Sequence, residues 1–188
     1  MTTVKIKKLI LADFKGIREK EYSFGDITKI MAANGLGKTT ISSAWYWLNS
    51  DKDYSLKSNP NILPIGVEEC HPRVEAVLDI NGKEVTIAKQ QKTSKSKPDD
   101  RRIVKTSTTN TYEINSVPKT ERDFREYLEL EGIDWDLFLP ISHPNVFTGQ
   151  KATDMRKVLF KMASEKSDFD IAGINEDTAD VAELLSDY

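Results

Sequence analysis

Apolar and polar residues alternate at the start of the chain, a period-two pattern that predicts a strand. Val4 and Ile6 alternate with lysines, and the apolar run Leu9-Ile10-Leu11 continues the pattern. A turn at residues 14–17 and a second strand at 18–24 complete a predicted hairpin. Residues 27–31 add a further apolar group, which predicts a third strand leading into a glycine-rich segment.

The spacing of apolar residues becomes helical after that segment. Residues 38–48 contain neither Gly nor Pro and place Ile41, Trp45 and Leu48 at helical spacing. Alternation then returns at 74–80, followed by Asn81-Gly82, a pair typical of a type I′ hairpin turn, and by a return strand. We therefore expect a helix between two strand hairpins.

The last third of the chain is predicted to be mainly helical. After a mobile tip at 92–100 and a strand at 101–114, Thr120 and Asp123 resemble a capping box and Gly132 a helix stop. Pro140 and Pro144 predict a loop. The remaining predicted elements are two helices, at about 153–163 and from Asn175 onward.

The segment between the third strand and the helix carries the most specific chemistry. Residues 32–39 read Ala-Ala-Asn-Gly-Leu-Gly-Lys-Thr, which we call the phosphate loop. Glycines let backbone N–H groups converge on an anion, and the N-terminus of the next helix adds a partial positive charge. Lys38 would reach the β- and γ-phosphates, and the Thr39 hydroxyl would hold Mg²⁺.

One position departs from the strict motif, which begins with Gly. Ala32 holds that place, and its Cβ would strain a turn that needed positive φ. The alternative interpretation is a plain β-turn at Asn34-Gly35 that happens to precede Gly-Lys. The flanking apolar run and helix favour the nucleotide site.

Composition describes a soluble globular protein. The 188 residues are 38% hydrophobic and 30% charged, and no stretch approaches the ~18 apolar residues that a membrane span needs. The chain starts without a secretory signal pattern, and Cys70 is its only cysteine. We therefore expect a cytoplasmic location and no binding to membranes. Cys70-His71 alone does not make a zinc site.

Charge is divided unevenly along the chain. Residues 83–105 hold eight basic and three acidic side chains, whereas 164–188 hold eight acidic groups and one lysine. The basic segment 89–105 is either a solvated loop or a contact for DNA phosphates. It lacks aromatic residues that would stack on bases, so any DNA contact would be non-specific.

Together these segments resemble a known family. The strand and turn LILADFKGI, the segment SFGDITKIMAANGLGKTTI and the helix AWYWL are similar to the SMC/SbcC/RecF group of ABC-type ATPases, which includes AAA-type versions carried by phages. Residues 112–162 also resemble the later part of an SbcC-like N-terminal head lobe. The resemblance implies an α/β fold, with a mixed β-sheet wrapped around the phosphate-loop helix and helices at the C-terminal end.

The resemblance also implies an organisation and a site. The chain would form one N-lobe over 1–188, with strands and loop at 1–50, antiparallel strands at 72–117 and helices at 119–188. ATP and Mg²⁺ would be the cofactors. By position, the nucleotide would be bound by Asn34, Gly35, Leu36, Gly37, Lys38, Thr39, Thr40, Lys15 and Arg18, and the metal by Thr39 and Gln150.

Two parts of the family's hydrolytic machinery are missing from the sequence. There is no apolar strand ending in Asp-Glu and no Leu-Ser-Gly-Gly-type loop; Asp134 and Asp136 are the nearest acidic candidates. The leading hypothesis is therefore an ATP-binding lobe, either excised or ending early. It would hydrolyse ATP only with a C-terminal lobe or second head in trans.

Two other hypotheses remain open. One is a stand-alone binding protein of a phage or mobile element that occupies a host nuclease, repair or defence complex. The other is a complete small NTPase or kinase, which the two leading strands disfavour.

Overall fold

The computed structural model describes residues 3–67, 70–95 and 106–163. These residues form two compact units, 1–133 and 134–188, of which the first contains the whole sheet. The predicted organisation of 1–188 as one lobe stays a prediction. The predicted helix after Asn175 lies outside the described residues. Within the described ranges, no helix has the length and apolar content that a membrane crossing requires.

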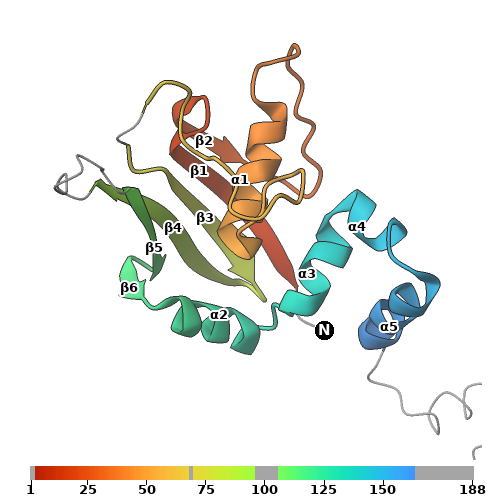
Figure 1. The fold of residues 1–188 in the computed structure, drawn as a ribbon. Helices are drawn as coiled ribbons and strands as arrows, with labels where there is room; N and C mark the ends of the chain where they lie inside the picture. The colour runs from red at the N-terminus through yellow and green to blue at the C-terminus, as the bar shows by residue number, and fades with distance from the viewer. Residues whose placement is uncertain (1–2, 68–69, 96–105, 164–188) are drawn as a thin grey trace, which may run out of the picture. The chain divides into compact units, whose positions relative to one another are not determined.

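The first unit is built on a six-stranded sheet with the order β2-β1-β3-β4-β5-β6 (Figure 1). The strands are β1 (Val4–Phe14), β2 (Ile17–Ser23), β3 (Arg73–Ile80), β4 (Lys83–Lys95), β5 (Thr106–Ile114) and β6 (Val117–Lys119). The α/β fold class is confirmed. The resemblance implied a mixed β-sheet, whereas each pairing among these strands is antiparallel.

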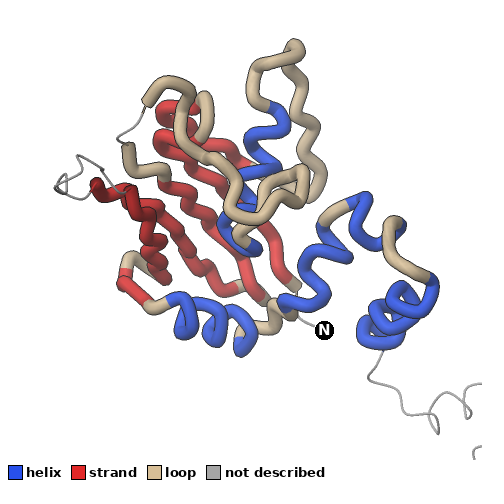
Figure 2. Tube along the Cα trace, in the orientation of Figure 1, coloured by secondary structure: helices blue, strands red, loops and turns tan. Residues whose placement is uncertain are grey.

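The predicted third strand is wrong. Residues 24–37 contain no strand and run as a loop between β2 and the first helix (Figure 2). Ile27 and Met31 are 87% and 89% exposed, so two of the three apolar residues that suggested a strand are almost fully exposed. A strand needs a neighbouring strand to pair its backbone groups. The Phe24 N–H donates to the Lys7 carbonyl of β1 at 2.8 Å, but residues 25–37 pair with none of the described strands.

One face of the sheet forms the core. Cross-strand pairing places Leu11, Val74, Lys89 and Tyr112 in one row and Leu9, Ala76, Ile87 and Ile114 in the next. All eight side chains are buried, and seven of them are apolar or aromatic. The face therefore follows the predicted alternation except at Lys89.

Helix α1 (Lys38–Ser50) follows the phosphate loop and packs on this face (Figure 1). Its buried side includes Ile41, Ala44, Trp47 and Leu48. Trp47, not the predicted Trp45, is the tryptophan in the core. Its ring contacts that of Phe14, with 5.6 Å between centroids.

The β3–β4 hairpin forms as predicted. Asn81 and Gly82 both have positive φ, 53° and 85°, which a type I′ turn requires. Strand β4 then extends to Lys95, so residues 92–95 belong to the sheet and not to the predicted tip. The rest of that tip, and the first five residues of the strand predicted at 101–114, lie outside the described residues.

Helix α2 (Glu121–Leu130) begins at the predicted cap. The Thr120 hydroxyl accepts a hydrogen bond from the Asp123 N–H at 3.1 Å. Phe124 and Leu128 are buried, and the Phe124 ring lies 5.1 Å from that of Tyr112. Gly132 follows with φ 94°, as expected of a helix stop.

The second unit contains α3 (Trp135–Ser142), α4 (Pro144–Thr148) and α5 (Ala152–Ala163). Helix α5 was predicted, but the loop expected at Pro140 and Pro144 is wrong. Pro144 occupies the first turn of α4, where its missing N–H is not needed. Pro140 lies inside α3. This helix begins after Asp134, and the Asp134 carboxylate accepts a hydrogen bond from the Leu137 N–H at 3.2 Å.

On the other face of the sheet, Arg73 of β3 forms hydrogen bonds across β4 to β5. Its guanidinium donates two hydrogen bonds to Glu113, at 3.0 and 2.7 Å, and a third to Glu75 at 2.9 Å. Ala88 stands between the two glutamates in the strand register, so its small side chain lets Arg73 reach across β4. The Arg73 bond holds the pKa of the Glu113 carboxyl below its usual value.

We predict that Arg73→Met lowers the free energy of unfolding by about 1.5 kcal/mol at pH 7, the range for a hydrogen bond to a charged group. Because the folded pKa of Glu113 is lowered, this stabilisation is present above the unfolded pKa of 4.5 and is lost as pH falls below it. Urea unfolding at pH 7 and pH 3.5 measures the difference.

Lys7→Met is the matched control, since Lys7 forms only a 3.5 Å surface pair with Asp79. An Arg73 effect that persisted unchanged at pH 3.5 would contradict the ion pair as its cause.

Candidate functional site

The phosphate loop has the backbone that its glycines predict. Gly35 and Gly37 both have φ 83°, a left-handed conformation that costs a non-glycine residue roughly 1–2 kcal/mol. Gly37 is also the residue that precedes the first turn of α1. Ala32 does not have positive φ, so its Cβ does not cause the backbone strain that a positive φ would have caused at this position.

The loop encloses an open pocket of about 280 Å³ at the N-terminus of α1. The pocket is lined by Asn34, Gly35, Gly37, Lys38, Thr39 and Thr40, which are six of the seven predicted loop contacts. Leu36, the seventh, is 70% exposed and does not line it. The volume is slightly below the roughly 300–1,000 Å³ of small-molecule sites, so it suits phosphate groups better than a whole nucleotide.

The Lys38 side chain bonds back to the first two residues of the phosphate loop. Its Nζ donates hydrogen bonds to the carbonyl oxygens of Ala32 and Ala33, the second at 3.0 Å. The first turn of α1 contains no acidic residue that would repel an anion. An anion in the pocket would therefore meet a helix N-terminus and a lysine whose present partners are neutral carbonyls.

The turn between β1 and β2 adjoins the loop. The Ile17 side chain lies 3.7 Å from where a Cβ on Gly37 would stand. Lys15, in this turn, has φ 53°, donates its N–H to the Ile62 carbonyl at 2.7 Å, and pairs with Asp53 at 3.5 Å. Arg18 is exposed at the start of β2. The topology thus brings this turn to the loop, and nucleotide contacts by Lys15 and Arg18 stay predictions.

The other predicted site residues belong to the second unit. Gln150 follows α4, and its Oε1 is buried with no hydrogen-bond partner among the described residues. Its assignment as a metal ligand stays a prediction. Asp134, one of the two nearest acidic candidates for catalysis, instead caps α3 and pairs with Lys161 at 2.8 Å.

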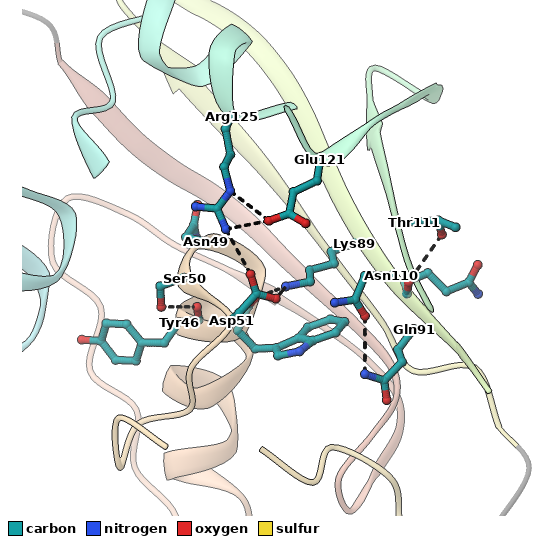
Figure 3. A network of polar contacts seen from close by, with 12 residues as sticks. Tyr46, Asn49, Ser50, Asp51, Lys89, Gln91, Asn110, Thr111, Glu121 and Arg125 are labelled. Atoms are coloured by element: carbon teal, nitrogen blue, oxygen red, sulfur yellow. Dashed lines mark hydrogen bonds and ion pairs between the residues drawn. The ribbon is translucent and has the colours of Figure 1, made fainter. Parts of the chain in front are cut away.

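Sequence reasoning missed the groups that hold the other end of α1. Lys89 is 1% exposed; its Nζ donates to the Trp47 carbonyl at 2.8 Å and pairs with Asp51 (Figure 3). Arg125 of α2 donates to the second Asp51 oxygen at 3.1 Å and also bonds Glu121. A lysine at a helix C-terminus favourably meets the negative end of the helix dipole.

This finding removes Lys89 from the basic segment 89–105, which was expected to be either a solvated loop or a contact for DNA phosphates. Lys89 is in the core. Lys83, which precedes that segment, pairs with Glu131 at 2.9 Å. The alternation Val85, Ile87, Lys89 already indicated that Lys89 faces the core. Burial lowers the pKa of Lys89, and the Asp51 carboxylate opposes that shift.

Comparisons with known proteins agree on the fold. No protein-family model matches the chain, and no curated protein matches it. Among solved structures, an SMC head bound to the C-terminal winged-helix domain of ScpA matches with a TM-score of 0.54 and 19% identity, over 95% of this chain and 54% of that chain. The recombination mediator RecF with ATP matches with a TM-score of 0.48 and 13% identity, over 100% and 55%.

The chain therefore shares its fold with part of an SMC head. At this level of identity the likeness establishes the fold and nothing further. The chain spans about half the length of the structures it matches.

We predict that Asp51→Asn lowers the free energy of unfolding by about 3 kcal/mol, because it leaves the buried Lys89 ammonium without its carboxylate. Adding Lys89→Met should restore most of the loss, since an apolar chain suits the row that Lys89 occupies. A double-mutant cycle tests this: the free energy of unfolding is measured with denaturant for the wild type, both single variants and the double variant.

Asp53→Asn is the matched control for the cycle, because Asp53 pairs with Lys15 at 3.5 Å, and an Asn oxygen can still accept the hydrogen bonds from the Ser55 and Lys57 N–H groups. Additive effects of the two substitutions would show that Lys89 and Asp51 do not depend on one another.

Proposed function

We propose that the chain is the ATP-binding N-terminal lobe of an SMC/SbcC/RecF-like ATPase that acts in DNA repair or chromosome maintenance. The pocket around Gly35 and Gly37, at the N-terminus of a helix with no acidic first turn, carries the proposal. RecF, solved with ATP, and the SMC head are the similar structures.

Phosphate binding needs little rearrangement of this loop. The Lys38 ammonium would exchange the two carbonyls it now contacts for β- and γ-phosphate oxygens, which are stronger acceptors because they are charged. The Thr39 hydroxyl, in the first turn of α1, is the group that would hold Mg²⁺. The metal would neutralise phosphate charge, while the chain supplies the fixed donors around it.

A partner lobe would complete the site. Ile27, Met31 and Leu36 form an exposed apolar segment around the loop, at 87%, 89% and 70% exposure. The missing Asp-Glu strand and Leu-Ser-Gly-Gly-type loop would come from a C-terminal lobe or a second head. Alone, the chain would bind ATP–Mg²⁺ without appreciable hydrolysis.

The same exposed segment also favours the alternative function, a phage-type binding protein that docks on a host repair or defence complex. In that case Ile27 and Met31 would contact the host protein, and the phosphate loop would be a relic. Non-specific DNA contact by residues 89–105, without Lys89, remains a further proposal.

We predict that calorimetry detects one ATP–Mg²⁺ site on the wild-type chain and that Lys38→Ala weakens it at least tenfold, because the variant loses a charge-assisted contact to phosphate. Trp45 and Trp47 lie on the same helix as Lys38 and provide a fluorescence readout of the titration. Phosphate release by the chain alone should stay at background.

Lys57→Ala, which removes an exposed lysine outside the loop, should bind like wild type. Equal ATP binding by Lys38→Ala, or none by the wild type, would overturn the nucleotide site. No ATP binding combined with a tight host-protein complex would select the alternative.

We predict that the double change Ile27→Asp and Met31→Asp alters the free energy of unfolding by less than about 0.5 kcal/mol, because both side chains are almost fully exposed. Dye binding to exposed apolar surface should fall at the same time. Thermal melts and dye fluorescence measure the two effects.

Leu9→Ala, in the buried row, provides the contrast and should cost about 3 kcal/mol. A comparable loss from the Ile27/Met31 change would mean that this segment packs within the lobe.

A further inference from the structure

A second pocket lies at the other end of α1 from the phosphate loop and shares no lining residue with it. It measures about 370 Å³ and is enclosed by the end of α1, residues 59–63 and strands β4 and β5. Its polar lining consists of Asp51, Asn59, Asn61, Gln91, Thr108 and Asn110. Four of these six side chains are carboxamides.

The sheet turns polar at this point on the face that otherwise forms the core. Beyond the row that contains Lys89 and Tyr112, the next rows on the same face pair Gln91 with Asn110 and Thr93 with Thr108. The Gln91 amide donates to the Asn110 carbonyl oxygen at 3.4 Å (Figure 3). Apolar residues at these positions would extend the core, whereas Gln91, Asn110 and Thr108 line a pocket.

Residues 59–63 form the opposite wall of the pocket and are held in place by backbone hydrogen bonds and burial. Asn59 has φ 49°, and its N–H donates to the Asp51 carbonyl at 3.3 Å. Ile62 is 1% exposed and accepts the hydrogen bond from the Lys15 N–H. The wall is therefore anchored by burial and backbone bonds on both sides of Asn61.

The charges around the pocket cancel. Asp51 and Glu121 are balanced by Lys89 and Arg125, all within one bonded network. Trp47 offers no open ring face, because it is 2% exposed, with the Lys89 ammonium 4.5 Å from its centroid and Phe14 packed against it. A ligand here would be held by hydrogen bonds, without ion pairing or ring stacking.

We propose that this pocket binds a small, neutral, hydroxyl-rich molecule of one or two sugar rings. Carboxamides carry both donors and an acceptor, which matches hydroxyl groups that also donate and accept. The Asn61 and Asn110 oxygens already accept from the Leu63 N–H and the Gln91 amide, which fixes how these two side chains are oriented. The volume falls within the roughly 300–1,000 Å³ of small-molecule sites. This binding is independent of the nucleotide proposal, because it uses none of the phosphate-loop residues.

The test is a titration of ¹⁵N-labelled chain, followed by NMR, with glucose, N-acetylglucosamine, trehalose and inositol. Binding of at least one should shift the side-chain amide signals of Asn61, Gln91 and Asn110 saturably. Gln91→Leu and Asn110→Leu should each weaken it about tenfold. Gln90→Leu, next in sequence but on the opposite face of β4, should not.

Glucuronate, a sugar ring that carries a carboxylate, should bind more weakly than glucose, since the described residues that line the pocket include a carboxylate and no basic side chain. The proposal is overturned if no member of the panel gives saturable shifts, if the shifts fall elsewhere, or if glucuronate binds as well or better. Should either leucine variant fail to fold, the residue-specific shifts of the wild-type chain decide the question.

Discussion

One buried amine bonds the C-terminal end of α1 to the sheet. Lys89 reaches from the middle of the sheet to the last turn of the helix, where its ammonium bonds the Trp47 carbonyl and the Asp51 carboxylate. A charge at 1% exposure is tolerated only with such partners. The requirement ties together β4, α1 and, through Arg125, α2. The phosphate loop, at the opposite end of α1, is thereby carried on a helix that is anchored to the sheet.

Features coded by neighbouring residues could be predicted from the sequence. The Asn81-Gly82 turn, the Thr120 cap and the glycine conformations of the phosphate loop all depend on a few consecutive residues. The loop was identifiable for the same reason, since most of its lining lies within one short segment. Proximity of the β1–β2 turn to the loop came from the family resemblance and agrees with the contact between Ile17 and Gly37.

Features that depend on distant partners could not be predicted in this way. Apolar residues at 27–31 have the composition of a strand, but a strand also needs backbone pairing, and none of the described strands pairs with these residues. Lys89 was counted with solvated lysines because its partner Asp51 is 38 residues away in the sequence. The acidic Asp134 suggested chemistry and proved to be a helix cap, a role that only the start of α3 reveals.

The strand order has a consequence for how the chain reaches this structure. Every neighbouring pair in the sheet is also consecutive in sequence except β1 and β3, which are separated by β2, the phosphate loop and α1. Closing so long a connection costs more chain entropy than closing a hairpin. We therefore expect the β3–β4–β5 meander to form early. The part that contains β1, β2 and the phosphate loop would join it late and assemble on a template already in place.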